Sequence, residues 1–153
     1  MQFTFHQMKQ EDAQQIASWH YAAPYEFYDW DQDQEDLAEL LDPQSWQESY
    51  YSIFNGENEL AGFFVFKPDG QTVEVGLGLR PDLTGKGLGQ EFLNAGLTFG
   101  QEHFSVGTWS LNVATFNKRA IRLYEHAGFT PLNTFMHYTN GGEYEFLWMV
   151  RST

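Results

Sequence analysis

The chain of 153 residues is predicted to be a single α/β domain, residues 1–153, with a mixed sheet of six or seven strands and about four helices. Three observations predict this fold. Apolar residues make up 42% of the chain, enough for a core. Short alternating runs are interleaved with runs that have helical spacing. No repeat, low-complexity tract or linker interrupts them.

The first half of the chain predicts two helices within a set of strands. Ile16 and Trp19 are spaced to share one helical face, and Pro43 stops the second helix. An aromatic loop, residues 21–30, connects the two helices. The expected elements are a strand at 2–7, helices at 9–20 and 33–41, and strands at 50–54 and 60–67.

The second half of the chain predicts two further helices and a closing hairpin. Asn117 is a plausible N-cap, and Gly128 ends the helix that follows it. The expected elements are strands at 72–79 and 108–113, helices from the glycine loop to residue 103 and at 117–127, and a hairpin of 129–138 with 143–150.

Composition excludes several classes of protein. The net charge of -13 disfavours binding to a nucleic acid backbone. There is no cysteine, hence no disulfide or thiolate metal site, and the histidines lack metal-ligand spacing, so no metal is expected. No apolar run reaches the roughly 20 residues that span a bilayer. The N-terminus lacks the pattern of a secretory signal, so a cytoplasmic protein is expected.

The charges are unevenly distributed along the chain. Residues 1–66 hold thirteen acids and one base, whereas residues 67–153 hold eight acids and seven bases. Two interpretations stay open: a solvated acidic face that aids solubility, or a positive pocket for an anion beside an acidic surface for a cation. The bases that would form such a pocket are Arg80, Lys86, Lys118, Arg119 and Arg122.

The segment from Thr84 to Gly89 is the strongest motif, because a strand passes through three glycines into a helix start. Helix N-termini present unpaired N–H groups and a positive dipole end, and glycine lets the backbone approach a bulky anion. A nucleotide P-loop fails because Gly87 follows Lys86 where Ser or Thr is required. A dinucleotide fingerprint fails on glycine spacing and on the mid-chain position of the strand.

A second motif, N-x-x-A-x-x-L-Y-x-x-x-G-F, begins at Asn117 and ends at Phe129. Together with the glycine loop, it resembles the paired signature of the GNAT acyltransferase superfamily, and the order of elements fits along nearly the whole chain. The loop signature is [QR]-x-x-G-x-[GA], and this chain has Thr84 in place of Gln or Arg. The resemblance implies a GNAT-like, mostly antiparallel sheet whose central parallel strand pair splays apart.

The resemblance also implies that the anion is the diphosphate of coenzyme A, with acetyl-CoA as co-substrate. Pantetheine would lie between the strands at 72–79 and 108–113, where Gly76 and Gly78 suit a strand that admits a ligand. The expected cofactor-binding residues are Leu77, Leu79, Thr84, Gly85, Lys86, Gly87, Leu88, Gly89, Asn117 and Arg119.

Two residues are the first candidates for catalysis. Tyr124 matches the family's usual general acid, which protonates the leaving thiolate; the alternative is a core tyrosine. Glu74 lies near a position where many relatives carry a glutamate that acts as base through water; the alternative is a solvated side chain. His20, His126 and His137 are other candidate bases.

The segment from residue 19 to residue 30 is rich in aromatic residues, with carboxylates interleaved. In relatives this region forms the acceptor side of the cleft, and aromatic faces beside carboxylates suit a cationic amine. Tyr25, Tyr28 and Trp30 are therefore predicted to bind a small-molecule or peptide amine; the alternative is that they fill the core.

The leading hypothesis is an N-acetyltransferase that acts by direct attack of a primary amine in a ternary complex. The alternatives are a non-catalytic acyl-CoA-binding module or sensor and a nucleotide-binding domain. No nucleic acid or membrane partner is expected. Aromatic residues in the C-terminal hairpin permit either a monomer or a homodimer.

Overall fold

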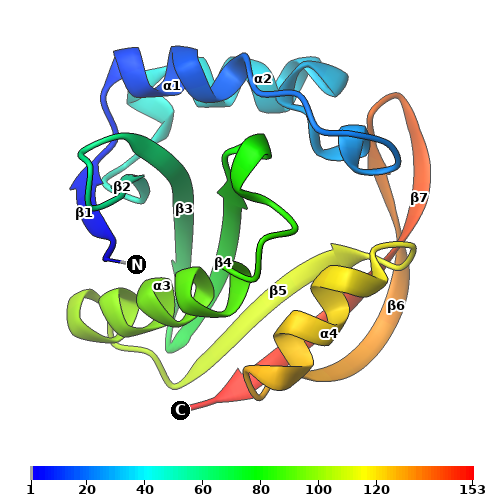
Figure 1. Cartoon of the computed structure of the whole chain (residues 1–153). Helices are drawn as coiled ribbons and strands as arrows, with labels where there is room; N and C mark the ends of the chain where they lie inside the picture. Colours follow the sequence, from blue (N-terminus) through cyan, green and yellow to red (C-terminus); the bar gives the residue numbers. More distant parts are fainter. Residues whose placement is uncertain (1) are drawn as a thin grey trace. The chain divides into compact units, whose positions relative to one another are not determined.

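The computed structural model describes residues 2–153 and has one seven-stranded sheet, whose order is β1-β2-β3-β4-β5-β7-β6 (Figure 1). The central strands β4 and β5 pair in parallel, whereas β1–β2, β2–β3, β5–β7 and β6–β7 are antiparallel. The predicted mixed, mostly antiparallel sheet with four α-helices is confirmed.

Within residues 2–153, the strands are accompanied by four α-helices and four short 3-10 turns. The strands are β1 (Thr4–Gln7), β2 (Tyr50–Phe54), β3 (Leu60–Asp69), β4 (Thr72–Leu79), β5 (Thr108–Ala114), β6 (Thr130–Thr139) and β7 (Gly142–Ser152). The helices are α1 (Gln10–Ala17), α2 (Gln34–Leu41), α3 (Gly89–His103) and α4 (Lys118–His126). The 3-10 turns are η1 (Tyr25–Tyr28), η2 (Trp30–Gln32), η3 (Pro43–Ser45) and η4 (Pro81–Leu83).

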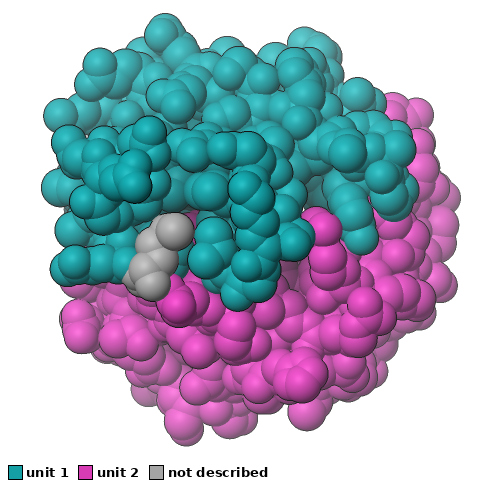
Figure 2. Space-filling view, in the orientation of Figure 1, with its two compact units in different colours: residues 1–65, 77–88 teal, residues 66–76, 89–153 magenta. Residues whose placement is uncertain are grey.

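The chain divides into two compact units, which Figure 2 distinguishes by colour. Unit 1 comprises residues 1–65 and 77–88, and unit 2 comprises residues 66–76 and 89–153. Strands β3 and β4 each contribute to both units. That residues 1–153 form a single domain stays a prediction.

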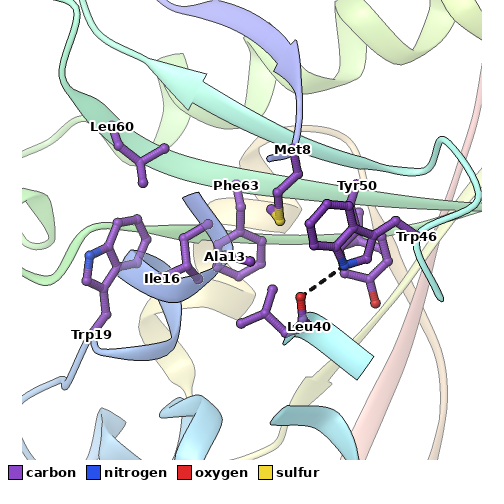
Figure 3. Packing of buried hydrophobic residues seen from close by; sticks show 10 residues of the cluster. Met8, Ala13, Ile16, Trp19, Leu40, Trp46, Tyr50, Leu60 and Phe63 are labelled. Carbon is purple, nitrogen blue, oxygen red and sulfur yellow. Dashed lines mark hydrogen bonds between the residues drawn. The ribbon is translucent and has the colours of Figure 1, made fainter. Parts of the chain in front are cut away.

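Unit 1 has a core in which the helices α1 and α2 pack against β2 and β3 (Figure 3). Ile16, Ala13 and Leu40 are fully buried, as the helical spacing predicts. The Trp46 indole Nε1 donates a 3.0 Å hydrogen bond to the Leu40 carbonyl, so this polar atom is satisfied within the core. The aromatic and aliphatic members of this core are Met8, Ala13, Ile16, Trp19, Leu40, Trp46, Tyr50, Leu60, Phe63 and Val65.

Unit 2 packs its apolar residues around a fully buried indole, Trp109 on β5. The ring of Phe66 lies 6.0 Å from that of Trp109 and 5.3 Å from that of Phe104, measured between centroids. A Cβ at Gly100 would collide with the Trp109 ring, so α3 needs glycine there.

The first helix begins one residue later and ends three residues earlier than predicted, with Ser18 as its C-cap. The Ser18 hydroxyl donates a 2.6 Å hydrogen bond to the Gln15 carbonyl, and its backbone N–H bonds to the same turn. The chain then turns so that Trp19 is buried, while His20 is exposed. The following loop, predicted without regular structure, contains the two 3-10 turns η1 and η2.

Strand β4 has the predicted bounds and buries Val73 and Val75, whereas Glu74 between them is exposed. The register between β4 and β5 covers three residue pairs, Thr72–Glu74 with Thr108–Ser110. Among residues 2–153, no helix combines the length and apolar character needed to cross a membrane.

Gly78 has a packing role that the sequence did not predict. A Cβ there would collide with the ring of Phe63, so the glycine admits a core aromatic ring. We expect Gly78→Ala to lower the free energy of unfolding by about 1–3 kcal/mol, because it overpacks this core. Gly56→Ala is the matched control, since nothing lies within 4 Å of a Cβ at Gly56. Equal denaturation midpoints for the two variants would contradict this role.

Candidate active site

The glycine loop of unit 1 has the backbone that an anion-binding loop requires. Gly85 and Gly87 adopt φ values of 72° and 77°, in the left-handed region that favours glycine. Both glycines and Lys86 are exposed, and nothing lies within 4 Å of a Cβ at Gly87. Leu88 is half-buried, and the chain continues directly into α3 at Gly89. Backbone N–H groups in such a loop are open to a ligand.

Thr84, which replaces the usual Gln or Arg, has a local partner. Its hydroxyl donates a 2.7 Å hydrogen bond to the Pro81 carbonyl and closes the turn η4. Arg80 is also engaged locally, with Nε 2.6 Å from Asp82 Oδ1 and Nη1 3.0 Å from the Leu60 carbonyl. The hydrogen bond from Arg80 lowers the pKa of the Asp82 carboxyl. The Arg80 guanidinium therefore stabilises the turn that precedes the glycine loop.

At the end of β4, some backbone N–H and C=O groups point away from the neighbouring strand β3. The Arg80 N–H donates a 2.8 Å hydrogen bond to the Ala61 carbonyl of β3. The Leu79 carbonyl belongs to the same trans peptide, so it points the opposite way. Backbone directions alternate along a strand, so Leu77 and Leu79 direct their N–H groups to this second edge as well. This is the edge at which β4 pairs with β5 at Thr72–Glu74.

In unit 2, α4 begins at the predicted cap. The Asn117 side chain accepts a 3.1 Å hydrogen bond from the Ala120 N–H, and Asn117 is buried. The Asn117 side chain is therefore used to start the helix. A Cβ on Gly89 would lie 3.2 Å from Leu123 Cδ2, so the start of α3 packs against α4. Arg119, in the first turn of α4, is exposed.

Tyr124 is half-buried on α4, with its ring 6.1 Å from that of Phe129 and tilted by 62°. The Phe129 N–H donates a 3.0 Å hydrogen bond to the Tyr124 carbonyl, which ties the helix end to the residue after Gly128. The other catalytic candidate, Glu74, is exposed on β4 and lies opposite Ser110 in the register. Both candidates belong to unit 2.

The three residues predicted to bind the amine acceptor lie in unit 1 and differ in how closely they pack against its core. The Trp30 ring packs edge-on against Phe63 at 5.6 Å and is partly buried against the core cluster. Tyr28 contacts Phe27 at 5.3 Å, and both Tyr28 and Tyr25 are half-buried. The core interpretation therefore holds in part for Trp30.

The structure brings together residues that the spacing along the chain did not reveal. His20 Nε2 lies 2.8 Å from Asp31 Oδ2. With the buried carboxylate of Asp29, the three groups each offer an oxygen or nitrogen within 4.8 Å of the others. The interleaved acids of the aromatic loop were the only sequence signal. That the protein needs no metal stays a prediction.

The imidazole of His20 has a raised pKa, because the hydrogen bond to Asp31 and the charge of Asp29 favour its protonated form. Any stability it supplies is therefore present below the ordinary pKa of 6.5 and is lost as pH rises through the raised value. We expect NMR titration to give His20 a pKa above 6.5, and Asp31→Asn to lower it. An unchanged pKa in Asp31→Asn would contradict this pairing.

The sheet order, the glycine loop and the helix cap at Asn117 agree with the resemblance to the acyltransferases. The chain belongs to the GNAT acetyltransferase family, because the model of the acetyltransferase (GNAT) domain matches residues 2–130. It is thus an enzyme of the acyltransferase class.

Individual relatives agree with this assignment. The chain is similar to mycothiol acetyltransferase from Propionibacterium freudenreichii, 39% identical over 62 residues; the match covers 40% of this chain but only 20% of that protein. Its fold is similar to spermidine N-acetyltransferase from Vibrio cholerae in complex with CoA and spermine, with a TM-score of 0.79 and 18% identity over 99% of this chain and 95% of that one. A chimera of the Vibrio cholerae enzyme and hSSAT has a TM-score of 0.75 and 19% identity over 99% and 96% of the two chains.

Proposed function

We propose that this protein transfers the acetyl group of acetyl-CoA to a primary amine by direct attack in a ternary complex. The observation that carries the proposal is the path of β4 into the loop with Gly85 and Gly87 and on into α3. Positive φ values and exposed backbone suit this loop to the diphosphate of coenzyme A. Family membership supports the same cofactor.

The residues proposed to bind the cofactor would contribute in different ways. The Leu77 and Leu79 backbone would hydrogen-bond pantetheine along the edge of β4 that points away from β3. The loop from Gly85 to Gly89 would bind the diphosphate, with Lys86 adding charge. Arg119 would contribute charge, whereas Asn117 and Thr84 would act by fixing the backbone, since both side chains have local hydrogen-bond partners.

A cationic amine must first lose one proton to become a nucleophile, and two further proton transfers accompany the transfer of the acetyl group. The amine nitrogen attacks the thioester carbon, the carbon–sulfur bond breaks, and the sulfur takes a proton from the Tyr124 hydroxyl. A phenol of pKa about 10 can protonate a thiolate of pKa about 8.5. The amine gives up a proton to a base, for which exposed Glu74 is the first candidate and His20 the second. The reaction as proposed uses no metal.

A cationic amine is the proposed acceptor class. Unit 1 carries 14 acidic and three basic side chains, so it attracts cations. Half-buried Tyr25 and Tyr28 can contribute cation–π contacts beside Asp29 and Asp31. A polyamine enters the list of test acceptors because the fold relative from Vibrio cholerae was solved with spermine.

The test is thiol release from acetyl-CoA across a library of amines that includes polyamines, aminoglycosides, amino acids and peptides. We expect turnover with cationic primary amines, and mass spectrometry should show one added acetyl group on the amine nitrogen. Preference for neutral or anionic acceptors would refute the acceptor class. Binding of acetyl-CoA without turnover on any amine would instead indicate an acyl-CoA-binding module.

A further inference from the structure

Tyr21 is held at both ends within unit 1. Its hydroxyl donates a 2.7 Å hydrogen bond to the Leu79 carbonyl, 58 residues away along the chain. Its backbone N–H donates a 2.9 Å hydrogen bond to Asp29 Oδ1. Tyr21 and Leu79 are both half-buried. The position of the Tyr21 hydroxyl is therefore fixed before any substrate binds.

The Tyr21 hydroxyl lies on a particular edge of β4. The Leu79 carbonyl that it contacts points away from β3, because the Arg80 N–H of the same peptide bonds to Ala61 on β3. This edge of β4 is the one proposed above to hold pantetheine. The loop that follows α1 thus brings a side-chain hydroxyl to the backbone where the thioester would lie.

The chemistry of this hydroxyl is restricted to accepting hydrogen bonds. Its proton is donated to the Leu79 carbonyl. Burial, with a smaller contribution from the Asp29 charge, raises the pKa of Tyr21 well above its usual value, so the phenol stays protonated at neutral pH. The oxygen lone pairs are left to accept from an N–H group.

We propose that the Tyr21 oxygen accepts a hydrogen bond from the attacking primary amine and thereby aims the nitrogen lone pair at the thioester. This inference rests on the proposed function. A neutral amine has N–H groups that need acceptors once water is excluded, and fixing one of them orients the lone pair. The nearby Asp29 carboxylate favours the cationic amine as it enters. Tyr21 is thus a substrate-binding residue that determines acceptor position.

The test is Tyr21→Phe, which keeps the ring and removes the hydroxyl. We expect kcat/KM for the amine to fall about 10- to 100-fold while KM for acetyl-CoA stays within about twofold. Tyr138→Phe is the matched control, because it removes the hydroxyl of a tyrosine that is 72% exposed. A Tyr21→Phe value of kcat/KM within twofold of wild type would overturn the proposal. A parallel loss in both substrates, with a lower melting temperature, would also overturn it by showing a structural role.

NMR provides a readout that does not depend on turnover. Adding a primary amine, such as a diamine, to the wild-type protein with bound CoA should shift the backbone amide signals of Tyr21 and Leu79, but not that of Tyr138. If no amine is acetylated, the proposed function is wrong, and these shifts alone decide whether Tyr21 binds amines. Unshifted Tyr21 and Leu79 signals at saturating amine would overturn the inference.

Discussion

Tyr124→Phe is expected to lower kcat by about 10²- to 10⁴-fold, the usual contribution of a general acid. The substitution keeps the ring, so the contact with Phe129 at 6.1 Å is preserved. It removes the only group on this side chain that can protonate the departing sulfur. The affinity for CoA should change by less than about twofold, because the loss concerns the transition state rather than cofactor binding.

Steady-state kinetics and calorimetry separate this role from a structural one. The melting temperature of the variant is measured beside kcat, and a fall in kcat that exceeds any change in stability supports the acid role. Tyr138→Phe should leave kcat unchanged. A Tyr124→Phe enzyme with wild-type kcat would exclude Tyr124 as the acid and leave it a packing residue.

Local patterns predicted the elements of the fold well. Strands 50–54 and 72–79 have the predicted bounds, because apolar alternation and flanking turns are local signals. Asn117 and Gly128 fixed α4 to within one residue at either end, because the capping groups adjoin the helix that they end. The first helix was overextended, since the Ser18 hydroxyl ends it without a glycine or proline.

Only those parts of the candidate site that form a continuous sequence motif could be predicted from the sequence. The glycine loop was predicted, and its two positive φ values agree with the expected anion loop. The contact between Tyr21 and Leu79 was missed, because it joins residues 58 positions apart through a loop of 3-10 turns. The packing role of Gly78 was missed for the same reason, since the ring that needs the space, Phe63, lies on another strand, β3. The hydrophobic periodicity of a sequence does not predict which distant side chains a loop brings into contact.

Gly87→Asp is expected to weaken CoA binding at least about 100-fold, which is the second large effect. Two unit charges about 5 Å apart repel by about 3 kcal/mol at an effective dielectric constant of 20, and a diphosphate in this loop would meet the new carboxylate. The left-handed backbone adds a cost of roughly 1–2 kcal/mol for any residue with a Cβ. Calorimetric titration with CoA measures the sum.

Two variants divide this effect into its parts. Gly87→Ala has the backbone cost alone, because φ is 77° and nothing lies within 4 Å of the Cβ. It should therefore weaken CoA binding about 10-fold or less, because the cost enters the affinity only as far as the free loop leaves the left-handed conformation and must return to it on binding. Gly56→Asp adds the same charge in open space on another turn and should leave CoA affinity unchanged.

Comparing Gly87→Asp with Gly87→Ala tests whether the loop binds an anion, separately from any effect on folding. Gly87 is exposed, so Gly87→Asp and Gly87→Ala should differ little in free energy of unfolding without ligand, yet they should differ strongly in CoA affinity. If the two variants bind CoA equally, charge in this loop is irrelevant to the cofactor, and the diphosphate must bind elsewhere. Equal binding would exclude the glycine loop as the site of the diphosphate, although the chain would still belong to the GNAT family.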